Sequence, residues 1–131
     1  MPKNEHAMRL LTHARAAAER AYAPYSNFAV GAALETENGT LYLGGNVENT
    51  SLGLTICAER SAVAAAVSAG ERCFRAIAIA APQAEKPLLP CGACLQVLAE
   101  FAEDLPIYTS GANGEIQETS LRTLLPQAFS R

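Results

Sequence analysis

The stretch FRAIAIAA, residues 74–81, is a short and uninterrupted apolar run that contains β-branched side chains. Such a run is typical of a strand buried on both faces of a sheet. Residues 57–69 before it and 91–103 after it have the apolar spacing of helices. Alternation of helix and strand predicts a layered α/β fold in which helices cover both faces of the sheet.

The remaining segments extend this pattern on both sides. Residues 4–22 carry apolar side chains at helical spacing and predict an amphipathic helix, on which His6 and His13 are expected to be solvated surface residues that ligate nothing. Asn38-Gly39 separates two strand-like runs and predicts a β-hairpin. Two short strands follow, at residues 106–110 and 115–119, and Ser120 suits the N-cap of a last helix.

We therefore expect an α/β protein with a three-layer α/β/α sandwich and a central mixed sheet of about five strands. With 131 residues, the chain is expected to form one domain spanning 1–131. The order of the strands in the sheet does not follow from these patterns.

Composition narrows the range of partners. Half of the residues are hydrophobic, 18% are charged, and the formal net charge is −3. A protein that binds a nucleic acid polymer through its phosphates needs a basic surface, so no such partner is expected. The sequence has neither a signal-peptide pattern nor an apolar run long enough to span a bilayer. We expect a cytoplasmic protein with no membrane partner, and a small-molecule ligand remains open.

Two tight clusters, CAER at residues 57–60 and PCGAC at residues 90–94, hold three of the four cysteines. In a reducing compartment, cysteines at this spacing are metal ligands or redox groups more often than structural disulfides. A redox pair of Cys91 and Cys94 would leave Cys57 without a use. A closed structural zinc site would need Cys73 as its fourth ligand, although that residue directly precedes the apolar run and is expected to be a small buried hydrophobe.

An open zinc site, with three thiolates and one water, accounts for more of the two clusters. Cys57, Cys91 and Cys94 all lie at predicted helix starts, where backbone amides favour anions and lower thiol pKa values. Arg60 would offset the negative charge of three thiolates. Glu59 would carry protons between water and a leaving group.

The sequence also resembles a known family along most of its length, from about residue 22 to residue 129. The segments that carry the resemblance are YSNFAVGAAL, GGNVENTS, CAERSA, PCGACLQVL and LLPQAF, in the order seen in short-chain cytidine deaminases. The resemblance implies that Cys57, Cys91 and Cys94 bind one Zn²⁺ per subunit and that Glu59 shuttles protons. It implies hydrolytic deamination of cytidine and deoxycytidine to uridine and deoxyuridine with release of ammonia, as in pyrimidine salvage.

The same resemblance implies substrate contacts. Asn46 and Glu48 match residues that hold the sugar, and Phe28 matches an aromatic that packs against the pyrimidine. Phe129 matches an aromatic that enters the site of a neighbouring subunit, which implies a homotetramer with shared active sites. Leu52 and Leu95 depart from the family pattern, which often has tyrosine and usually has arginine at these positions.

Three other functions are compatible with the motifs. One is a deaminase of a modified cytosine nucleoside or of a cytosine-bearing antibiotic. The second is a non-catalytic, zinc-stabilised interaction domain, which predicts a closed four-cysteine site. The third is a redox protein in which Cys91 and Cys94 cycle to a disulfide.

Overall fold

The computed structural model describes residues 2–131, and side chains from residue 5 onward. The helices are α1 (Pro2–Ala18), α2 (Ala58–Ser68), α3 (Gly92–Ala99) and the short α4 (Leu121–Leu124), with a 3₁₀ turn at Leu52–Leu54. The strands are β1 (Gly31–Thr36), β2 (Leu41–Gly45), β3 (Phe74–Ala80), β4 (Pro106–Ser110) and β5 (Ile116–Ser120). Within the described part of the chain, no helix combines the length and the apolar character needed to cross a membrane.

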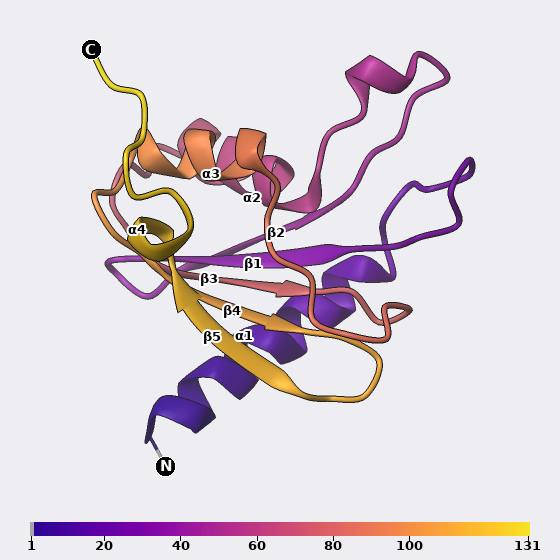
Figure 1. The fold of residues 1–131 in the computed structure, drawn as a ribbon, viewed down its shortest axis with the longest axis horizontal. Helices are drawn as coiled ribbons and strands as arrows, with labels where there is room; N and C mark the ends of the chain where they lie inside the picture. Colours follow the sequence, from indigo (N-terminus) through magenta and orange to yellow (C-terminus); the bar gives the residue numbers. More distant parts are fainter. Residues whose placement is uncertain (1) are drawn as a thin grey trace.

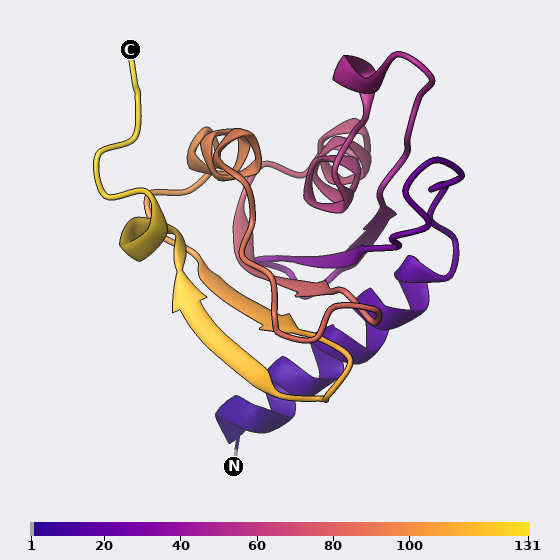
Figure 2. The same ribbon diagram turned by 45° about the vertical axis from the view of Figure 1, so that its right-hand side comes forward.

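The strands form one sheet in the order β2-β1-β3-β4-β5. Only the central pair β3 and β4 is parallel, and the other pairings are antiparallel, so the sheet is mixed. Helix α1 covers one face of the sheet and α2 and α3 lie side by side over the other, as both ribbon views show (Figures 1 and 2). This arrangement confirms the predicted three-layer sandwich with five strands.

The alternating sequence of β3 divides the core into two layers of different character. Alanines of β1 and β3 face α1, whereas larger aliphatic side chains, among them Ile77 and Ile79, face α2 and α3. Small side chains let α1 lie close to the sheet: a Cβ at Gly31 would lie 1.9 Å from the carbonyl oxygen of Ala14. The alternation of small and large apolar side chains in β3 therefore also determines how closely each helix layer lies to the sheet.

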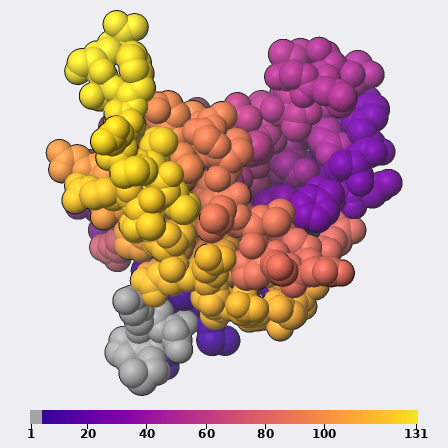
Figure 3. Space-filling model, in the orientation of Figure 1, coloured from indigo at the N-terminus to yellow at the C-terminus, as the bar shows by residue number. Residues whose placement is uncertain are grey.

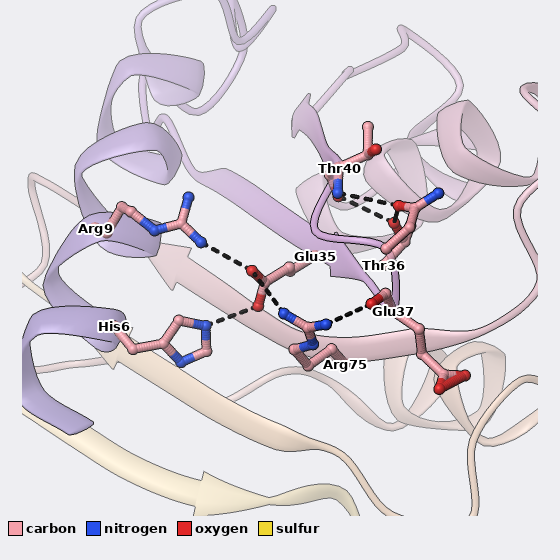
Figure 4. Close-up of polar contacts among 8 residues, drawn as sticks. His6, Arg9, Glu35, Thr36, Glu37, Thr40 and Arg75 are labelled. Carbon is pink, nitrogen blue, oxygen red and sulfur yellow. Dashed lines mark hydrogen bonds and ion pairs between the residues drawn. The ribbon is translucent and has the colours of Figure 1, made fainter. Parts of the chain in front are cut away.

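A buried carboxylate also ties α1 to the sheet. The Glu35 side chain is only 2% exposed, and it accepts hydrogen bonds from His6 Nε2 at 2.7 Å and from Arg9 at 2.8 Å (Figure 4). Arg75 of β3 lies 3.7 Å from the same carboxylate. His6 also packs edge-on against Tyr108. The expectation that His6 is a solvated surface residue is therefore wrong, because helical periodicity gives no sign of an acidic partner on β1, whereas His13 is exposed as predicted.

Two helices are shorter than the apolar spacing predicts. Helix α1 ends at Ala18 instead of residue 22, because Tyr22 pairs with Val47 through its backbone instead of continuing the helix. Helix α3 ends at Ala99 instead of residue 103, and Phe101 turns back to pack on Phe74 with ring centroids 5.2 Å apart. In both places a contact with a distant segment overrides the local helical pattern. Ser120 caps α4 as expected, since its hydroxyl accepts a hydrogen bond from the Thr123 amide.

The strand pairing brings several chain segments to one end of the sheet. Gly31, at the start of β1, faces Gly45 at the end of β2 and Ala80 at the end of β3. Since β4 runs parallel to β3, its carboxyl end lies there as well. Both α2 and α3 begin after chain segments that leave this end. The carboxyl ends of strands joined through helices are common places for ligand sites in α/β proteins.

Close packing of β2 holds α2 in place. A Cβ on Gly44 would lie 2.4 Å from the backbone nitrogen of Ala62 and 2.6 Å from the carbonyl oxygen of Ala58. Backbone atoms cannot move aside as the end of a flexible side chain can, so any side chain at residue 44 forces the helix away from the sheet. The position of α2, and of the CAER segment at its start, depends on this glycine.

We predict that Gly44→Ala destabilises the fold by about 1–3 kcal/mol through overpacking, which lowers the thermal midpoint by several degrees. The matched control is Gly53→Ala, where an added Cβ meets nothing within 4 Å. Thermal unfolding followed by circular dichroism measures both variants. Equal midpoints for the two variants would contradict the role assigned to the contact between β2 and α2.

Candidate metal and substrate site

Three thiols meet where α2 and α3 begin. Cys57 is the N-cap residue of α2, Cys91 is the N-cap residue of α3, and Cys94 lies in the first turn of α3. The Sγ atoms of Cys57 and Cys91 are 4.0 Å apart, and those of Cys91 and Cys94 are 3.5 Å apart. All three Sγ atoms lie within 4.8 Å of one another. Residues 34 positions apart in the chain thus form one cluster.

The geometry of the cluster fits a zinc ion. Four tetrahedral ligands at the usual Zn–S distance of about 2.3 Å lie roughly 3.8 Å from one another. The two measured Sγ separations lie on either side of this value. Three thiols provide three corners of a tetrahedron, and among the described residues the cluster includes no fourth histidine, cysteine or carboxylate ligand. The arrangement is that of an open site rather than a closed structural one.

Cys73 does not belong to the cluster, as the sequence predicted, but it is not buried. It lies before β3, at the opposite end of the sheet from the other three cysteines, and its side chain is exposed. A hydrogen bond with Glu37 and the negative charge of that residue raise the pKa of the Cys73 thiol. The expectation of a small buried hydrophobe is wrong because the apolar strand begins only at Phe74.

The electrostatics of the cluster also favour a cation. Burial opposes ionisation of Cys91, but backbone amides at the start of α3 and the neighbouring thiols lower the pKa of Cys91 overall. For Cys94, burial and the negative charge of Glu59 raise the pKa of the thiol. Anionic forms of Cys94 and Glu59 therefore destabilise each other, and a cation among the thiolates relieves this repulsion.

Glu59 lies in the first turn of α2 and is only 6% exposed, although it is a carboxylate. Burial raises the pKa of the Glu59 carboxyl, an effect opposed by its backbone hydrogen bond, the charge of Arg60 and a hydrogen bond with Cys94. A carboxyl group is seldom buried without a partner or a function. The structure brings Glu59 to the thiol cluster, as the CAER motif indicated.

Arg60 directs its guanidinium to the sulfurs. Its Nη2 donates a hydrogen bond to Cys57 Sγ at 3.6 Å. The Nε atom of the same side chain is buried and has no hydrogen-bond partner in the described residues. The hydrogen bond to Cys57, followed by the interactions with Cys94, raises the pKa of Arg60, so its positive charge is permanent. Arg60 thus compensates part of the negative charge of the thiol cluster.

A cavity of about 230 Å³ opens beside the cluster and is lined by Cys57, Glu59, Cys91 and largely apolar neighbours: Val30, Asn46, Thr55, Ala58, Ile79, Leu88 and Leu89. The space-filling view shows a hollow between the purple segment before β1, the magenta segment that leads into α2 and the orange segment of α3 (Figure 3). The volume is below the roughly 300–1,000 Å³ typical of sites for drug-sized ligands. It suits a compact ligand such as a single heterocyclic base.

Asn46 reaches this cavity and is 9% exposed. Its Oδ1 accepts a hydrogen bond from the Val30 amide, and its Nδ2 donates one to the Phe28 carbonyl, each at 2.9 Å. A side-chain amide has two donors and two acceptor positions, so one of each remains for a ligand. Asn46 therefore both fixes the segment before β1 and keeps polar capacity at the cavity.

Glu48 and Phe28 lie in the segments around this cavity but not in its wall. The Glu48 carboxylate accepts hydrogen bonds from the backbone amides of Tyr25 and Ser26 and from the Ser26 hydroxyl. The hydroxyl contributes most to lowering the pKa of Glu48. Phe28 is half-buried in the same loop. The structure thus groups Phe28, Asn46 and Glu48 through hydrogen bonds of the loop before β1.

Phe129 stands apart from the other predicted site residues. It is 72% exposed near the chain's C-terminal end, and its carbonyl accepts a hydrogen bond from the Gln96 side chain of α3. Leu52 is 73% exposed on the 3₁₀ turn, whereas Leu95 is buried in the apolar core between the sheet and α3. Neither leucine lines the cavity with the cysteines.

Sequence reasoning missed two groups of site residues. Leu88 and Leu89 line the cavity from the loop between β3 and α3. Their position in the sequence, as an apolar pair between two prolines directly before Cys91, could have indicated that they lie at the site. Val30 and Ile79 join the wall because strand ends meet there. Their sequence context gave no sign of this, since both look like ordinary core residues.

Two helix N-termini of this three-layer α/β/α sandwich present three thiols and a buried carboxylate beside a compact cavity. This combination defines a zinc-dependent hydrolase of the deaminase class. The sequence model of one family, described as the cytidine and deoxycytidylate deaminase zinc-binding region, matches residues 4–120. The chain belongs to this family.

Individual relatives agree with the family match. The chain is 49% identical over 124 residues to a cytidine deaminase of Sporosarcina psychrophila, covering 94% of this chain and 90% of the relative. It is 48% identical over 122 residues to a cytidine deaminase of Halalkalibacterium halodurans, covering 92% of each. The crystal structure of cytidine deaminase from Burkholderia pseudomallei superposes with a TM-score of 0.89 at 47% identity, covering 93% of this chain and 98% of that one.

We predict that Cys57→Ser lowers the affinity for zinc by at least 10-fold, because an alcohol is a far weaker zinc ligand than a thiolate. Cys73→Ser serves as the matched control and is expected to keep one zinc per chain. Zinc content after dialysis against a graded chelator measures both variants. If Cys73→Ser also loses zinc, a closed four-cysteine site replaces the open one.

Proposed function

We propose that this protein catalyses the zinc-dependent hydrolytic deamination of cytidine and deoxycytidine to uridine and deoxyuridine, with release of ammonia, as a step of pyrimidine salvage. One observation carries the proposal: the buried Glu59 carboxylate shares a compact cavity with Cys57 and Cys91, whose thiols form one cluster with that of Cys94. The relatives at 48–49% identity that bear the name cytidine deaminase support the substrate.

The chemistry requires water to add at carbon 4 of the cytosine ring and the amino group to leave as ammonia. Zinc held by the three thiolates would supply a Lewis acid that activates water. Glu59 would take a proton from the water and pass it to ring nitrogen 3, and would then take the proton of the hydroxyl added at carbon 4 and pass it to the departing amino group. A buried carboxylate beside the cavity suits this task, because burial raises the pKa of Glu59 and so makes its protonated form easier to reach.

The surrounding residues would hold the substrate and balance charge. Arg60 would stabilise the thiolate cluster through its hydrogen bond to Cys57. Asn46 would offer its remaining donor and acceptor to the sugar, and Glu48 would accept from a sugar hydroxyl. Phe28 would pack against the pyrimidine ring.

The alternative functions are supported less well. A zinc-stabilised interaction domain needs a fourth protein ligand and gives the buried Glu59 no purpose. A redox pair of Cys91 and Cys94 leaves Cys57, 4.0 Å from Cys91, unexplained. A deaminase of a modified cytosine would share the zinc site, but the relatives at 48–49% identity that bear the name cytidine deaminase favour the unmodified nucleoside.

We predict that Glu59→Gln lowers kcat by at least 10³-fold while one zinc per chain is retained, because the amide keeps the shape of the side chain but cannot carry a proton. The loss of cytidine's ultraviolet absorbance follows the reaction, and metal analysis of the same samples gives the zinc content.

The matched control for this experiment is Glu103→Gln, which changes an exposed glutamate in the same way and is expected to leave kcat unchanged. A zinc-loaded wild-type protein that leaves cytidine, deoxycytidine and related nucleosides unaltered would refute the proposed function. A Glu59→Gln variant with full activity would refute the role of Glu59 alone.

We further propose that residues 1–131 form one deaminase-like domain that assembles as a homotetramer with shared active sites in the cytoplasm. The four free cysteines are consistent with a reducing compartment. A group of exposed apolar side chains on residues 22–25 and 47–56 supports assembly. It comprises Tyr22, Tyr25, Val47, Leu52, Leu54 and Ile56. Phe129, also exposed, would enter the site of a neighbouring subunit.

A subunit-mixing experiment tests the shared site. We predict that Phe129→Ala loses activity although its own Glu59 is intact, and that hybrid tetramers with Glu59→Gln subunits regain part of it. In such hybrids a Phe129 from the Glu59→Gln subunit completes a site that keeps its Glu59. Activity after unfolding and refolding the mixture, with mass by sedimentation, measures the outcome. A monomeric mass, or hybrids no more active than their parents, would contradict shared sites.

A further inference from the structure

The loop before β1 is bound to the segment after β2 by an unusually complete set of hydrogen bonds. The Tyr22 amide donates to the Asn46 carbonyl, and the Glu48 amide donates to the Tyr22 carbonyl, both at 2.8 Å. The Asn46 side chain then holds the backbone of Phe28 and Val30. Backbone contacts alone would therefore bring the two segments together, so the side-chain contacts of the loop need a separate explanation.

The Glu48 carboxylate is almost, but not completely, saturated. Its Oε1 accepts from the Tyr25 amide at 2.9 Å and from the Ser26 amide at 3.1 Å. Its Oε2 accepts from the Ser26 hydroxyl. A carboxylate offers about four acceptor positions, two on each oxygen. The three hydrogen bonds of the loop fill three of these positions, which leaves one acceptor position on Oε2.

Among these contacts, the side chain of Ser26 alone links Glu48 directly to Phe28. It donates to Glu48 Oε2 and accepts from the Phe28 amide at 3.0 Å. The hydroxyl therefore fixes the direction in which the remaining acceptor position of Oε2 points, relative to the backbone that carries the Phe28 ring. Asn27, between the two, has a left-handed backbone with φ of 56°, which keeps the turn tight.

We propose that Ser26 is a positioning residue of the sugar subsite, whose hydroxyl aims the one free acceptor of Glu48 at a single hydroxyl of the nucleoside. The proposal rests on the proposed function, in which Glu48 accepts from the sugar. It predicts that Ser26 contributes to recognition of one sugar hydroxyl only, and contributes little to the chemistry at the base. The hydroxyl's main share in lowering the pKa of Glu48 is consistent with a carboxylate held in its accepting form.

The test compares four substrates: cytidine and its 2′-deoxy, 3′-deoxy and 5′-deoxy analogues. Glu48→Gln first identifies the hydroxyl that Glu48 contacts. It is the hydroxyl missing from the analogue whose kcat/KM this substitution lowers least. Ser26→Ala is expected to lower kcat/KM for cytidine by about 10- to 100-fold, chiefly through KM, and to change it less than 3-fold for that same analogue. Ser26→Thr keeps a hydroxyl and is expected to retain the wild-type selectivity.

Ser68→Ala, at the exposed end of α2, is the matched control and is expected to leave all four substrates unaffected. Thermal midpoints verify that the exposed Ser26 position tolerates the change. If Ser26→Ala lowers kcat/KM equally for all four substrates while Glu48→Gln singles out one of them, Ser26 has only a structural role and the inference is overturned. If Glu48→Gln itself shows no selectivity among the four, the proposed sugar contact fails, and inactivity of the wild type on cytidine defeats the proposed function.

Discussion

The site depends on one constraint, which is that α2 and α3 begin at the same end of the sheet. The strand order puts β1 between β2 and β3, so the chain leaving β2 and the chain leaving β3 start from neighbouring points. Each then enters a helix with a cysteine as its N-cap residue. Because the amides of both helix N-termini point toward the thiols, the fold supplies a site for an anionic ligand set before any metal is considered.

That placement creates a problem of charge, which the neighbouring residues resolve. Three thiols and the buried Glu59 gather at one end of the sheet, where Cys94 is buried and Cys57 is partly buried. Burial and the negative charge of Glu59 raise the pKa of Cys94, whereas burial raises the pKa of Glu59. A divalent cation and the guanidinium of Arg60 reduce the net negative charge. The metal is thus part of what makes the cluster electrostatically tolerable, as well as a source of chemistry.

Local patterns predicted what depends on local physics. The apolar run of β3, the hairpin at Asn38-Gly39 and the clustering of Cys57 with Cys91 and Cys94 follow from periodicity, turn chemistry and ligand spacing. Contacts between distant segments did not follow. The hydrogen bonds of Glu35 with His6 and Arg9, and the early end of α3 before Phe101, depend on which strands become neighbours. Strand order depends on contacts along the whole chain, so the pattern of any one segment does not predict it.

The segment between β2 and α2 carries both predicted ligand residues and exposed apolar side chains. It begins with Asn46 and Glu48, continues through the exposed Leu52 and Leu54, and ends at Cys57. Its first residues, Asn46 and Glu48, are held by hydrogen bonds to the loop before β1, whereas the part beyond them is held by the 3₁₀ turn and the bridge of Val47 to Ile56. A segment of this kind owes much of its order to what its exposed apolar side chains contact. In the proposed homotetramer, covering those side chains would order the part of the segment that leads to Cys57. The proposed assembly and the proposed nucleoside site would then depend on the same segment of the chain.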